Sequence, residues 1–599
     1  MKLLLVAINA KYIHSNLAVH SLRTYVLAHT QGKQGQINLA EYTINHDQEE
    51  ILKGIYRDKA QIVAFSCYLW NIDMVLRLSK ELKKVSPEVK IWLGGPEVSY
   101  DAKACLSRYP EIEGIIVGEG EQTFLELYEY FVDQENDIGN RNGPVNTDRI
   151  LSLDSLENIK GLVYRMQREL GEEIIETPVR PPLNLDDIPF PYNNIEDFKN
   201  KIIYYESSRG CPYSCSYCLS SADSKVRLRS SELVKKELKL FLDCRVPQVK
   251  FVDRTFNCNR KHAMEIWSFL KEEDNGITNF HFEISADLLR PEEIELLSAL
   301  RPGQVQFEIG IQTTNPDTIT AIRRKMDLEQ LKENVSRIRE GKNIHQNLDL
   351  IAGLPLEDYA SFERSFQTVY ELRPDQLQLG FLKVLKGSPM EEDSRDYHII
   401  YRDTAPYEVL YTSRLSFEEI LRLKGVCEMV EVYYNSGQFD YSIRYLEHFY
   451  PVRMQLFEKL NQYYEDLGLT LMAHGRLRRY EILLSFYKDK VLPELSLKDA
   501  ASADEFMEVF EEILLMDLYL REDLKSKPAF AAGRVRSRNL KELYEQYRKE
   551  YQFIHIEQFA YDLEASVREG KAVKKETIVL FHYGNRDPLS HSASVKRIE

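Results

Sequence analysis

The chain has 599 residues, of which 43% are hydrophobic and 29% charged, and its formal net charge is -16. This is the composition of a globular protein, and the length predicts about three or four domains rather than one hydrophobic core. The acidic balance disfavours nucleic acid and anionic membranes as partners. The sequence has no run of about 18 apolar residues, so it predicts no transmembrane helix. The apolar run at 1–7 is too short for a signal peptide, and the sparse, mostly isolated cysteines predict a cytoplasmic protein with reduced thiols.

Residues 1–133 alternate short apolar runs with amphipathic stretches of helical spacing. The expected strands are Leu3–Ala7, Ile37–Ala40, Ile62–Phe65, Ile91–Leu93 and Ile115–Val117. Continuous apolar strands separated by helices indicate a parallel sheet that is covered on both faces. We therefore predict a doubly wound, Rossmann-like α/β domain, whose ligands bind at the carboxyl ends of the strands.

Two glycine-containing turns follow expected strands of this domain. One holds Gly94 and Gly95, and the other reads Gly118-Glu119-Gly120-Glu121. Glycine lets the backbone approach a ligand closely and adopts positive φ, although a tight strand-to-helix turn has the same need. The loop after the third expected strand contains Ser66 and Trp70, which are further candidates for contact with a ligand.

Residues 134–200 have the composition of a linker. A polar, turn-rich stretch comes first, and an expected hairpin pairs residues 161–165 with 173–176. Prolines between 181 and 191 then predict an extended crossing into the next domain.

Residues 201–390 again alternate strand and helix. The expected strands are Ile202–Tyr205, Val249–Val252, Phe280–Ile284, Val305–Ile311, Leu348–Ala352 and Leu377–Phe381. Six β-α units predict a partial (β/α)6 barrel with its chemistry at the carboxyl ends of the strands.

Three cysteines, Cys211, Cys215 and Cys218, follow the first of these strands at the spacing C-x3-C-x2-C. Three thiolates on one loop can hold three corners of a [4Fe-4S] cluster, which otherwise takes four, so one iron is left free to bind a substrate or cofactor. A zinc site or a ferredoxin would need a fourth ligand nearby, but the next candidates, Cys244 and His262, are isolated. A disulfide would need an oxidising compartment.

Residues 391–599 carry helical patterns rich in Leu, Tyr, Glu and Arg. Ser416 and Glu419 form an expected capping box, and the apolar residues of 506–514 have core-helix spacing. Residues 577–583 read as a late strand. We predict a mainly α-helical C-terminal domain, whose role does not follow from its residues.

The cysteine loop, in which Tyr217 precedes the last cysteine, resembles the loop of radical S-adenosylmethionine (SAM) enzymes. Together with it, the two glycine turns resemble the cobalamin-binding domain of the cobalamin-dependent members, and residues 391–599 resemble an uncharacterised extension of one subgroup. The resemblance implies a [4Fe-4S] cluster ligated by the three cysteines, SAM and cobalamin as cofactors, and no catalytic side chain. It also implies that Ser66, Trp70, Gly94, Gly95, Gly118, Glu119, Gly120 and Glu121 contact cobalamin. The loop after the first strand lacks the Asp-x-His-x-x-Gly pattern that supplies a cobalt ligand elsewhere, so the axial ligand stays open.

The same resemblance assigns contacts to SAM. Glu308 and Gln312 lie in a segment similar to Glu-x-Gly-x-Gln-Ser, and Gly353 lies in a Gly-Leu-Pro. Asp253 stands where the family often has Gly-Gly-Glu, a motif that this chain lacks. Carboxylates suit ribose hydroxyls, but a structural salt bridge is an equal alternative for Glu308.

The expected function is methylation of an unactivated carbon of a small-molecule substrate, which the sequence does not identify. In the family, one-electron cleavage of SAM gives a 5′-deoxyadenosyl radical, and flavodoxin or ferredoxin supplies the electron. A radical rearrangement, cyclisation or oxidation without methyl transfer is the enzymatic alternative. An electron-transfer or RNA-binding module is the non-enzymatic one, and the net charge disfavours RNA. A methylthiotransferase would need three N-terminal cysteines, and only Cys67 and Cys105 precede residue 200.

Overall fold

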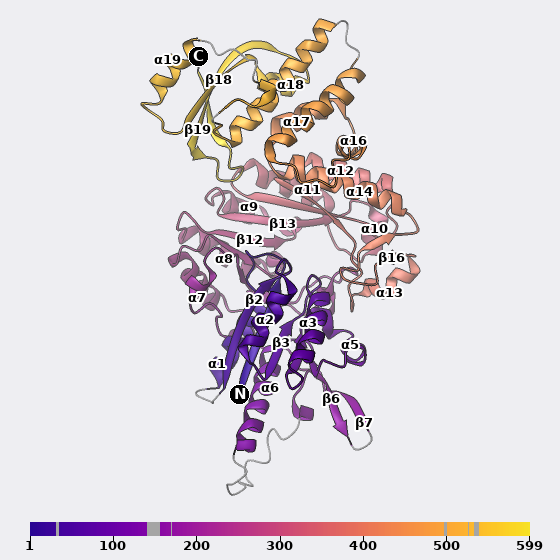
Figure 1. The fold of residues 1–599 in the computed structure, drawn as a ribbon. Helices are drawn as coiled ribbons and strands as arrows, with labels where there is room; N and C mark the ends of the chain where they lie inside the picture. Colours follow the sequence, from indigo (N-terminus) through magenta and orange to yellow (C-terminus); the bar gives the residue numbers. More distant parts are fainter. Residues whose placement is uncertain are drawn as a thin grey trace. The chain divides into compact units, whose positions relative to one another are not determined.

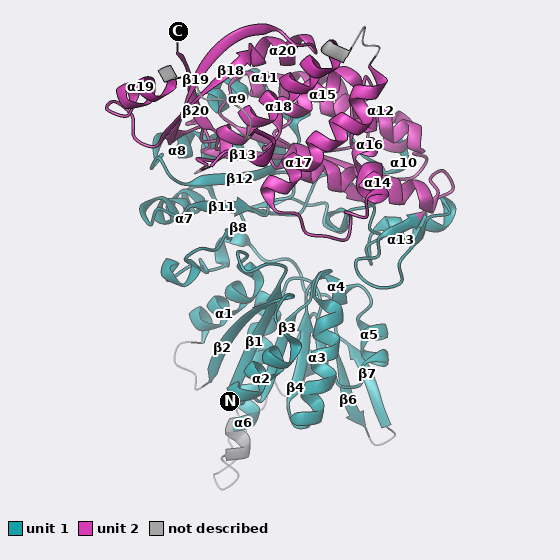
Figure 2. Cartoon of the chain, turned by 45° about the horizontal axis from the view of Figure 1, so that its top comes forward, with its two compact units in different colours: residues 1–299, 320–326, 382–410 teal, residues 300–319, 327–381, 411–599 magenta. Residues whose placement is uncertain are grey.

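The computed structural model describes residues 1–30, 35–139, 156–168, 171–495, 500–524, 526–531 and 538–598. Figure 1 labels the elements in chain order, and Figure 2 colours the two compact units of the chain. Unit 1 comprises residues 1–299, 320–326 and 382–410, and unit 2 comprises residues 300–319, 327–381 and 411–599. In the described ranges, no helix is both long and apolar enough to cross a membrane.

The first domain of unit 1 is built on a sheet with the strand order β2-β1-β3-β4-β5-β6-β7. Its first five strands are parallel, and all five were predicted from their apolar runs. The strands are β1 (Lys2–Asn9), β2 (Gln36–Thr43), β3 (Ile62–Ser66), β4 (Lys90–Gly94), β5 (Gly114–Ile116), β6 (Leu162–Arg168) and β7 (Gly171–Glu176). The helices are α1 (Leu17–His29), α2 (Gln48–Asp58), α3 (Ile72–Val85), α4 (Pro96–Ser99), α5 (Ala102–Arg108) and α6 (Glu121–Gly139).

Helices cover both faces of this sheet, as expected for a doubly wound fold. Alternate residues of β1 belong to different cores because successive side chains of a strand point to opposite faces. Leu4 and Val6 pack in a core with the buried sides of α2, α3 and α5. Leu3 and Leu5 pack in the other, with α1 and α6. Both cores are apolar and closely packed, so they hold the carboxyl ends of the strands in fixed positions.

The hairpin expected in the linker forms β6 and β7, which pair antiparallel. It is more than a linker element, because β6 pairs antiparallel with β5 and so extends the sheet of the first domain. Residues 134–139, expected to begin a turn-rich linker, instead continue helix α6, and residues 140–155 lie outside the described part of the chain.

The second part of unit 1 contains three parallel strands, with β11 between β8 and β12. These strands are β8 (Ile203–Tyr205), β11 (Gln248–Phe251) and β12 (Asn279–Ile284), and a small antiparallel pair joins β9 (Ser208–Arg209) to β10 (Arg227–Leu228). The helices are α7 (Ser231–Asp243), α8 (Arg260–Glu272), α9 (Pro291–Ser298) and α13 (Pro389–Asp396).

Residues 382–410 also belong to unit 1 and pack against its first domain. Lys386 Nζ lies 2.9 Å from Asp101 Oδ2, and the Tyr407 hydroxyl donates a hydrogen bond to Glu97. Burial raises the pKa of Glu97, while Tyr407 and Lys386 act in the opposite direction. This segment, which contains the short strand β16 (Ile400–Tyr401), therefore supports the loop that follows β4.

Unit 2 begins with the other three expected strands, which are parallel with β14 between β13 and β15. They are β13 (Val305–Gln312), β14 (His345–Ala352) and β15 (Gln376–Phe381), accompanied by α11 (Leu328–Glu340) and α12 (Tyr359–Glu371). The short α10 (Pro316–Ala321) and β17 (Val409–Tyr411) lie where the chain passes between units. All six predicted strands of residues 201–390 are confirmed, and the described strands form no closed barrel.

The rest of unit 2 is mainly helical, as predicted, and the Ser416–Glu419 capping box is present. Its helices are α14 (Phe417–Val430), α15 (Asp440–Leu446), α16 (Arg453–Asp466), α17 (Arg476–Phe486), α18 (Ala500–Arg521), α19 (Arg538–Tyr547) and α20 (Leu563–Glu569). The single predicted late strand is the middle one of an antiparallel sheet of β18 (Ile554–Tyr561), β19 (Lys574–Arg586) and β20 (Ala593–Ile598). The flanking strands were missed because polar residues interrupt their alternation.

Candidate functional site

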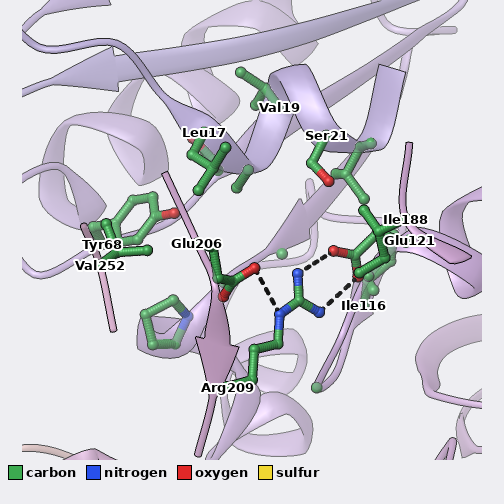
Figure 3. A pocket seen from close by; sticks show the side chains of 18 of the residues that line it. Leu17, Val19, Ser21, Tyr68, Ile116, Glu121, Ile188, Glu206, Arg209 and Val252 are labelled. Atoms are coloured by element: carbon green, nitrogen blue, oxygen red, sulfur yellow. Dashed lines mark hydrogen bonds and ion pairs between the residues drawn. The ribbon is translucent and has the colours of Figure 1, made fainter. Parts of the chain in front are cut away.

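A cavity of about 760 Å³ lies in unit 1, at the carboxyl ends of β1, β3, β4 and β5. Its wall combines strand-end loops of the first domain, the crossing segment 185–192, and residues on both sides of the cysteine loop, including Arg209, Gly210 and Ser220. Figure 3 shows Arg209 and Glu206 facing Glu121 across part of this wall. A volume in this range suits a large organic ligand. The cavity lies where the sheet topology predicted a ligand site.

Most of the predicted cobalamin contacts lie in the wall of this cavity, namely Ser66, Trp70, Gly94, Gly95, Gly118, Gly120 and Glu121. Gly95 has φ +119, and a Cβ there would lie 2.5 Å from the carbonyl oxygen of Cys67. Gly118 has φ +80, and a Cβ there would meet no atom within 4 Å. The turn at Gly95 thus requires glycine for its own geometry, whereas Gly118 leaves open space beside the cavity. Glycine loops that leave such space fit the nucleotide tail of cobalamin.

Trp70 is 46% exposed, so its side chain is not packed in the core. Its ring stacks on Tyr68 with 4.5 Å between centroids and 4° between planes, and Nε1 donates to the Ile8 carbonyl at 3.0 Å. Burial raises the pKa of Tyr68 to about 12, so its hydroxyl stays protonated at neutral pH. The two rings form a flat, apolar wall with one polar edge. His14, by contrast, does not line this cavity, and its Nδ1 lies 2.6 Å from the Tyr204 hydroxyl.

The cysteine loop is held in place by backbone hydrogen bonds. Cys211 N donates to the Asp223 carbonyl at 3.0 Å, and Cys218 N donates to the Cys215 carbonyl at 3.1 Å. Gly210 has φ +91, and a Cβ there would lie 2.5 Å from the Lys225 carbonyl oxygen. The residue before the first cysteine must therefore be glycine.

All three cysteines are free thiols, with Cys211 and Cys215 buried and Cys218 partly exposed. Arg324 Nη1 lies 3.9 Å from Cys215 Sγ and donates to the Tyr217 hydroxyl at 3.0 Å. Burial raises the pKa of the Cys215 thiol, and the Arg324 guanidinium opposes this rise by favouring the thiolate, the form that ligates iron. In the described part of the chain, no three His, Cys, Asp or Glu side chains are grouped around the position of a single metal ion.

We expect Gly210→Ala to lower iron incorporation and thermal stability together, because the added Cβ collides with backbone and not with a movable side chain. Gly276→Ala is the matched control: Gly276 also has positive φ, +74, but open space around its Cβ position. Both variants carry the strain of a left-handed alanine, about 1–2 kcal/mol. Iron analysis and thermal unfolding of the two variants separate the shared strain from the collision. Equal iron content in both would contradict the prediction.

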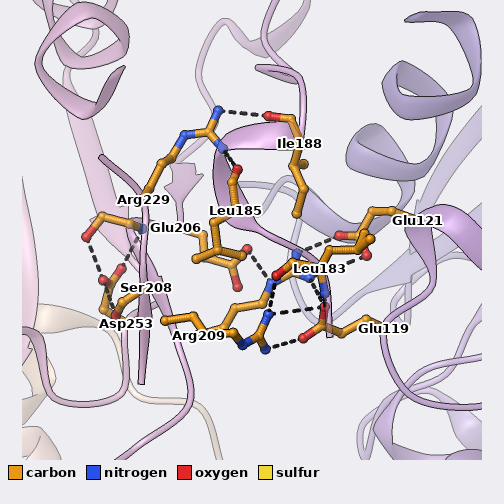
Figure 4. Close-up of polar contacts among 12 residues, drawn as sticks. Glu119, Glu121, Leu183, Leu185, Ile188, Glu206, Ser208, Arg209, Arg229 and Asp253 are labelled. Atoms are coloured by element: carbon orange, nitrogen blue, oxygen red, sulfur yellow. Dashed lines mark hydrogen bonds and ion pairs between the residues drawn. The ribbon is translucent and has the colours of Figure 1, made fainter. Parts of the chain in front are cut away.

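A network of charged residues joins the Gly-Glu-Gly-Glu turn to the strand before the cysteine loop (Figure 4). Arg209 Nη2 lies 2.5 Å from Glu121 Oε1, Nη1 lies 3.3 Å from Glu119 Oε2, and Nε donates to Glu206 at 2.9 Å. Burial raises the pKa of Glu206, while Arg209 opposes the rise. Arg209 is therefore the shared counter-ion of three carboxylates around the cavity.

Glu119 is not one of the residues that form the cavity wall. Its carboxylate pairs with Arg227 and accepts a hydrogen bond from Leu183 N at 3.1 Å. Although burial raises the pKa of Glu119, Arg227 and Arg209 outweigh it and lower the pKa overall. The predicted contact between Glu119 and cobalamin gains no support from this position, and the residue instead anchors the crossing segment.

A second arginine fixes the crossing segment from the other side. Arg229 Nη2 pairs with Glu237 at 2.6 Å and also donates to the Ile188 carbonyl at 2.8 Å, while Nη1 donates to the Leu185 carbonyl (Figure 4). Because a guanidinium has five donors in a fixed plane, it can serve a carboxylate and two carbonyls at once. Arg229 thereby holds Ile188, a residue of the cavity wall, in position.

Asp253, the predicted partner of the SAM amino group, is 1% exposed and does not line the cavity. Its carboxylate accepts hydrogen bonds from Ser207 N at 3.0 Å, Ser207 Oγ at 2.6 Å and Ser208 Oγ at 2.6 Å. These bonds connect the end of β11 to the residues that follow β8. Asp253 thus supports the start of the cysteine loop, and its contact with SAM stays a prediction.

Glu308, Gln312 and Gly353 belong to unit 2. Glu308 is in β13, and Gln312 ends that strand with φ +71 at a bulge. The Gln312 Oε1 atom is buried without a hydrogen-bond partner. Gly353 follows β14 with φ +84. The roles of all three toward SAM stay predictions.

Four residues of the site, Arg209, Glu206, Arg324 and Tyr68, were not predicted from the sequence. Arg209 stands two residues before Cys211, and its partner Glu206 is three residues earlier, but its other two carboxylate partners lie 88 and 90 residues away in the chain. A single sequence offers no signal that pairs charges over such separations. For Tyr68 the sequence did offer a weak signal, because Tyr68 lies two residues before Trp70 in a loop that was already a candidate for ligand contact.

Three family models match this chain. They are the B12 binding domain over residues 3–128, the radical SAM superfamily over residues 205–369, and a protein family of unknown function, DUF4080, over residues 395–581. The first two matches cover the sheet domain and the segment that contains the three cysteines.

Curated relatives are similar at low identity. A 2-(S-pantetheinyl)-carbapenam-3-carboxylate methyltransferase of Streptantibioticus cattleyicolor is 23% identical over 74% of this chain and 66% of its own length. The cobalamin-dependent radical SAM methyltransferase TokK of Streptomyces tokunonensis is 24% identical over 57% and 49%. An anaerobic magnesium-protoporphyrin IX monomethyl ester cyclase of Rubrivivax gelatinosus is 22% identical over 55% and 57%. The chain thus spans between about half and two thirds of these relatives.

Two solved structures share the fold. The radical SAM methyltransferase TsrM of Kitasatospora setae, with cobalamin and a [4Fe-4S] cluster, has a TM-score of 0.53 at 16% identity and covers 68% of this chain and 79% of its own. The cobalamin-dependent SAM radical enzyme OxsB, with aqua-cobalamin, has a TM-score of 0.56 at 14% identity and covers 86% and 80%.

Proposed function

We propose that this chain, which joins a B12-binding domain to a radical SAM domain and a DUF4080 region, is a methyltransferase that methylates an unactivated carbon of a small molecule. The observation that carries the proposal is a single cavity lined both by the glycine turns of the B12-binding domain and by residues beside the cysteine loop. Methyl transfer from cobalamin to a carbon activated by SAM cleavage needs the two cofactors to share one space.

The residues present fit the cofactors that these domains imply. Cys211, Cys215 and Cys218 would hold the cluster, and the open side of Gly118 would admit cobalamin. When bound, the cluster supplies the electron that cleaves SAM, and cobalamin supplies the methyl group. The protein's own contribution is to exclude water and fix the geometry: Trp70 and Tyr68 present a flat apolar wall, while Arg209 and Arg229 immobilise the loops around it.

Two further assignments complete the proposal. The electron donor would be a small redox protein such as flavodoxin or ferredoxin, because the cluster must be reduced once per SAM that it cleaves. A cytoplasmic location is supported by the eight cysteines, of which none forms a disulfide bond and five lie outside the proposed cluster loop.

The test is an anaerobic assay of the reconstituted protein that counts both products of SAM. Methylation with hydrogen abstraction should give 5′-deoxyadenosine and S-adenosylhomocysteine in equal amounts, one SAM being cleaved and one donating its methyl group. The absorption spectra of bound iron-sulfur cluster and cobalamin, recorded first, establish that both cofactors are loaded. A loaded protein that forms neither product would refute the proposal.

A second candidate is a radical rearrangement, cyclisation or oxidation in which no methyl group is transferred. The similarity to a cyclase as well as to methyltransferases favours this class of reaction over electron transfer or RNA binding. In the same assay such a reaction gives 5′-deoxyadenosine without S-adenosylhomocysteine. An electron-transfer or RNA-binding module would cleave no SAM at all.

A further inference from the structure

A second cavity, in unit 2, is lined largely by cationic side chains. It has a volume of about 290 Å³, and its wall consists of Gln438, Arg476, Arg521, Arg586 and His591. These residues come from five separate places in the chain: the segment before α15, the first residue of α17, the last residue of α18, the last residue of β19, and the loop before β20. Tertiary folding, rather than a local run of basic residues, therefore brings the three guanidinium groups together.

Backbone carbonyls hold two of these guanidinium groups. Arg521 Nη2 donates to the Ser436 carbonyl at 2.9 Å, and its Nη1 donates to Ser590. Arg586 donates to the carbonyls of His591 at 2.7 Å and of Arg521 at 3.2 Å. Carbonyls orient a guanidinium without neutralising it, and within the described ranges neither arginine forms an ion pair. Both guanidinium groups are thus fixed in direction without a carboxylate paired to either, while the Asp517 carboxylate acts on Arg521 from a greater distance.

Arg476 is the exception, because it pairs with Glu522 at the edge of the pocket. The pocket therefore carries three guanidinium groups against one carboxylate, a net charge of two positive units. Burial lowers the pKa of Arg521, and Arg586 and Arg476 lower it further, against the opposite effects of Tyr480 and Asp517. Like charges held this close repel one another, and a bound anion would remove the repulsion.

The remaining polar group of the wall is the amide of Gln438. Its Oε1 is buried, and no other described residue forms a hydrogen bond with it. Because the two ends of an amide are almost isosteric, a rotation of 180° would place the NH₂ group at this position. The amide would then donate to a ligand that offers only acceptors.

We propose that this pocket of unit 2 binds a phosphate group, carried by a small molecule or free in solution. Arginine recognises phosphate with two parallel hydrogen bonds, and the dianionic charge matches the net charge of two positive units. A single carboxylate would neutralise only half of that charge. A cavity of about 290 Å³ has room for a phosphate ester of modest size and not for a nucleic acid strand. This site is independent of the proposed methyl transfer.

The test is isothermal titration of the full-length, cofactor-loaded protein with inorganic phosphate, pyrophosphate and glycerol 3-phosphate at constant ionic strength. We expect saturable binding of one equivalent. Tighter binding of glycerol 3-phosphate than of inorganic phosphate would identify a phosphorylated small molecule as the ligand, and the reverse order would identify the free ion. Absence of saturation with all three compounds at millimolar concentration would overturn the proposal.

Two variants with opposite expectations connect the binding to the pocket. Arg586→Gln should weaken phosphate binding about tenfold, the effect of losing one charge-assisted pair. Glu522→Gln removes the carboxylate that pairs with Arg476 of the pocket, so it should tighten binding severalfold, a gain that misfolding cannot produce. Arg597→Gln is the control, since this arginine pairs with Asp562 and Glu564 elsewhere in unit 2. Equal affinities in all three variants would also overturn the proposal.

Discussion

Replacing Cys215 with alanine is expected to abolish SAM cleavage while cobalamin binding is retained. Loss of one thiolate leaves a [4Fe-4S] cluster with two protein ligands on a loop that offers no replacement, because the nearest other cysteines in sequence are isolated. The rate of 5′-deoxyadenosine formation should fall by more than about 100-fold, since even the partners of metal ligands contribute about 10–100-fold. Cys215 does not line the large cavity of unit 1, so cobalamin affinity should change little.

The control for this experiment is Cys244→Ala. Cys244 is an exposed, free thiol at the end of α7, so the same substitution there removes a sulfur without touching the loop. Iron content, the cluster's absorption and the cobalamin spectrum should all be those of the unmodified protein. If the Cys215 variant kept its iron and cleaved SAM, the assignment of this cysteine as a cluster ligand would be wrong.

Arg209→Gln is expected to destabilise the protein and to weaken cobalamin binding. The substitution leaves Glu121, Glu119 and Glu206 without their shared counter-ion beside the cavity. Breaking a buried pair by removing one partner costs about 3–5 kcal/mol, and we expect the lower end because 17% of the Arg209 side chain is exposed. Thermal unfolding should show a lower first transition, and titration with hydroxocobalamin should show about tenfold weaker binding, a loss of about 1.4 kcal/mol.

Two companion variants show whether the loss is electrostatic. In Arg209→Gln with Glu121→Gln, one uncompensated carboxylate is removed, so part of the stability should return. Arg168, at the end of β6, forms exposed ion pairs with Glu157 and Glu173. Arg168→Gln removes both pairs and should change the free energy of unfolding by less than about 0.5 kcal/mol. A double variant as unstable as the single one would exclude the charge network as the cause.

The strands of both α/β parts were predictable because buried parallel strands are short, continuous apolar runs. The strand β3 is the predicted run Ile62–Phe65 extended by one residue, and β15 is the predicted run Leu377–Phe381 extended by one residue. The hairpin at β6 and β7 was also expected, yet not its pairing with β5. Antiparallel extension of a parallel sheet leaves no mark in the periodicity of either strand, so the sequence alone could not show it.

The candidate site was predictable where a residue type has a special backbone or chemical property. Gly95, with its positive φ, and the three cysteines were found in this way. Residues whose role depends on partners distant in the chain were missed, as Arg209 was. The supporting role of Asp253 was missed in the same way: Ser207 and Ser208, 46 and 45 residues earlier, donate hydrogen bonds to its carboxylate, while its contact with SAM stays a prediction.

Residues 382–410 belong to unit 1 although they follow residues 327–381 of unit 2 in the chain. This limits the positions at which the protein can be divided into fragments. A fragment ending after β15 would contain every core strand, but Glu97 would lose Tyr407, and Asp101 would lose Lys386. Both carboxylates follow β4 in the segment that begins with Gly95, a residue of the cavity wall in unit 1. The truncation would therefore disturb the proposed cobalamin site, although the deleted residues lie about 300 positions later in the sequence. Chimaeras that exchange the C-terminal region between related enzymes should therefore be joined beyond residue 410.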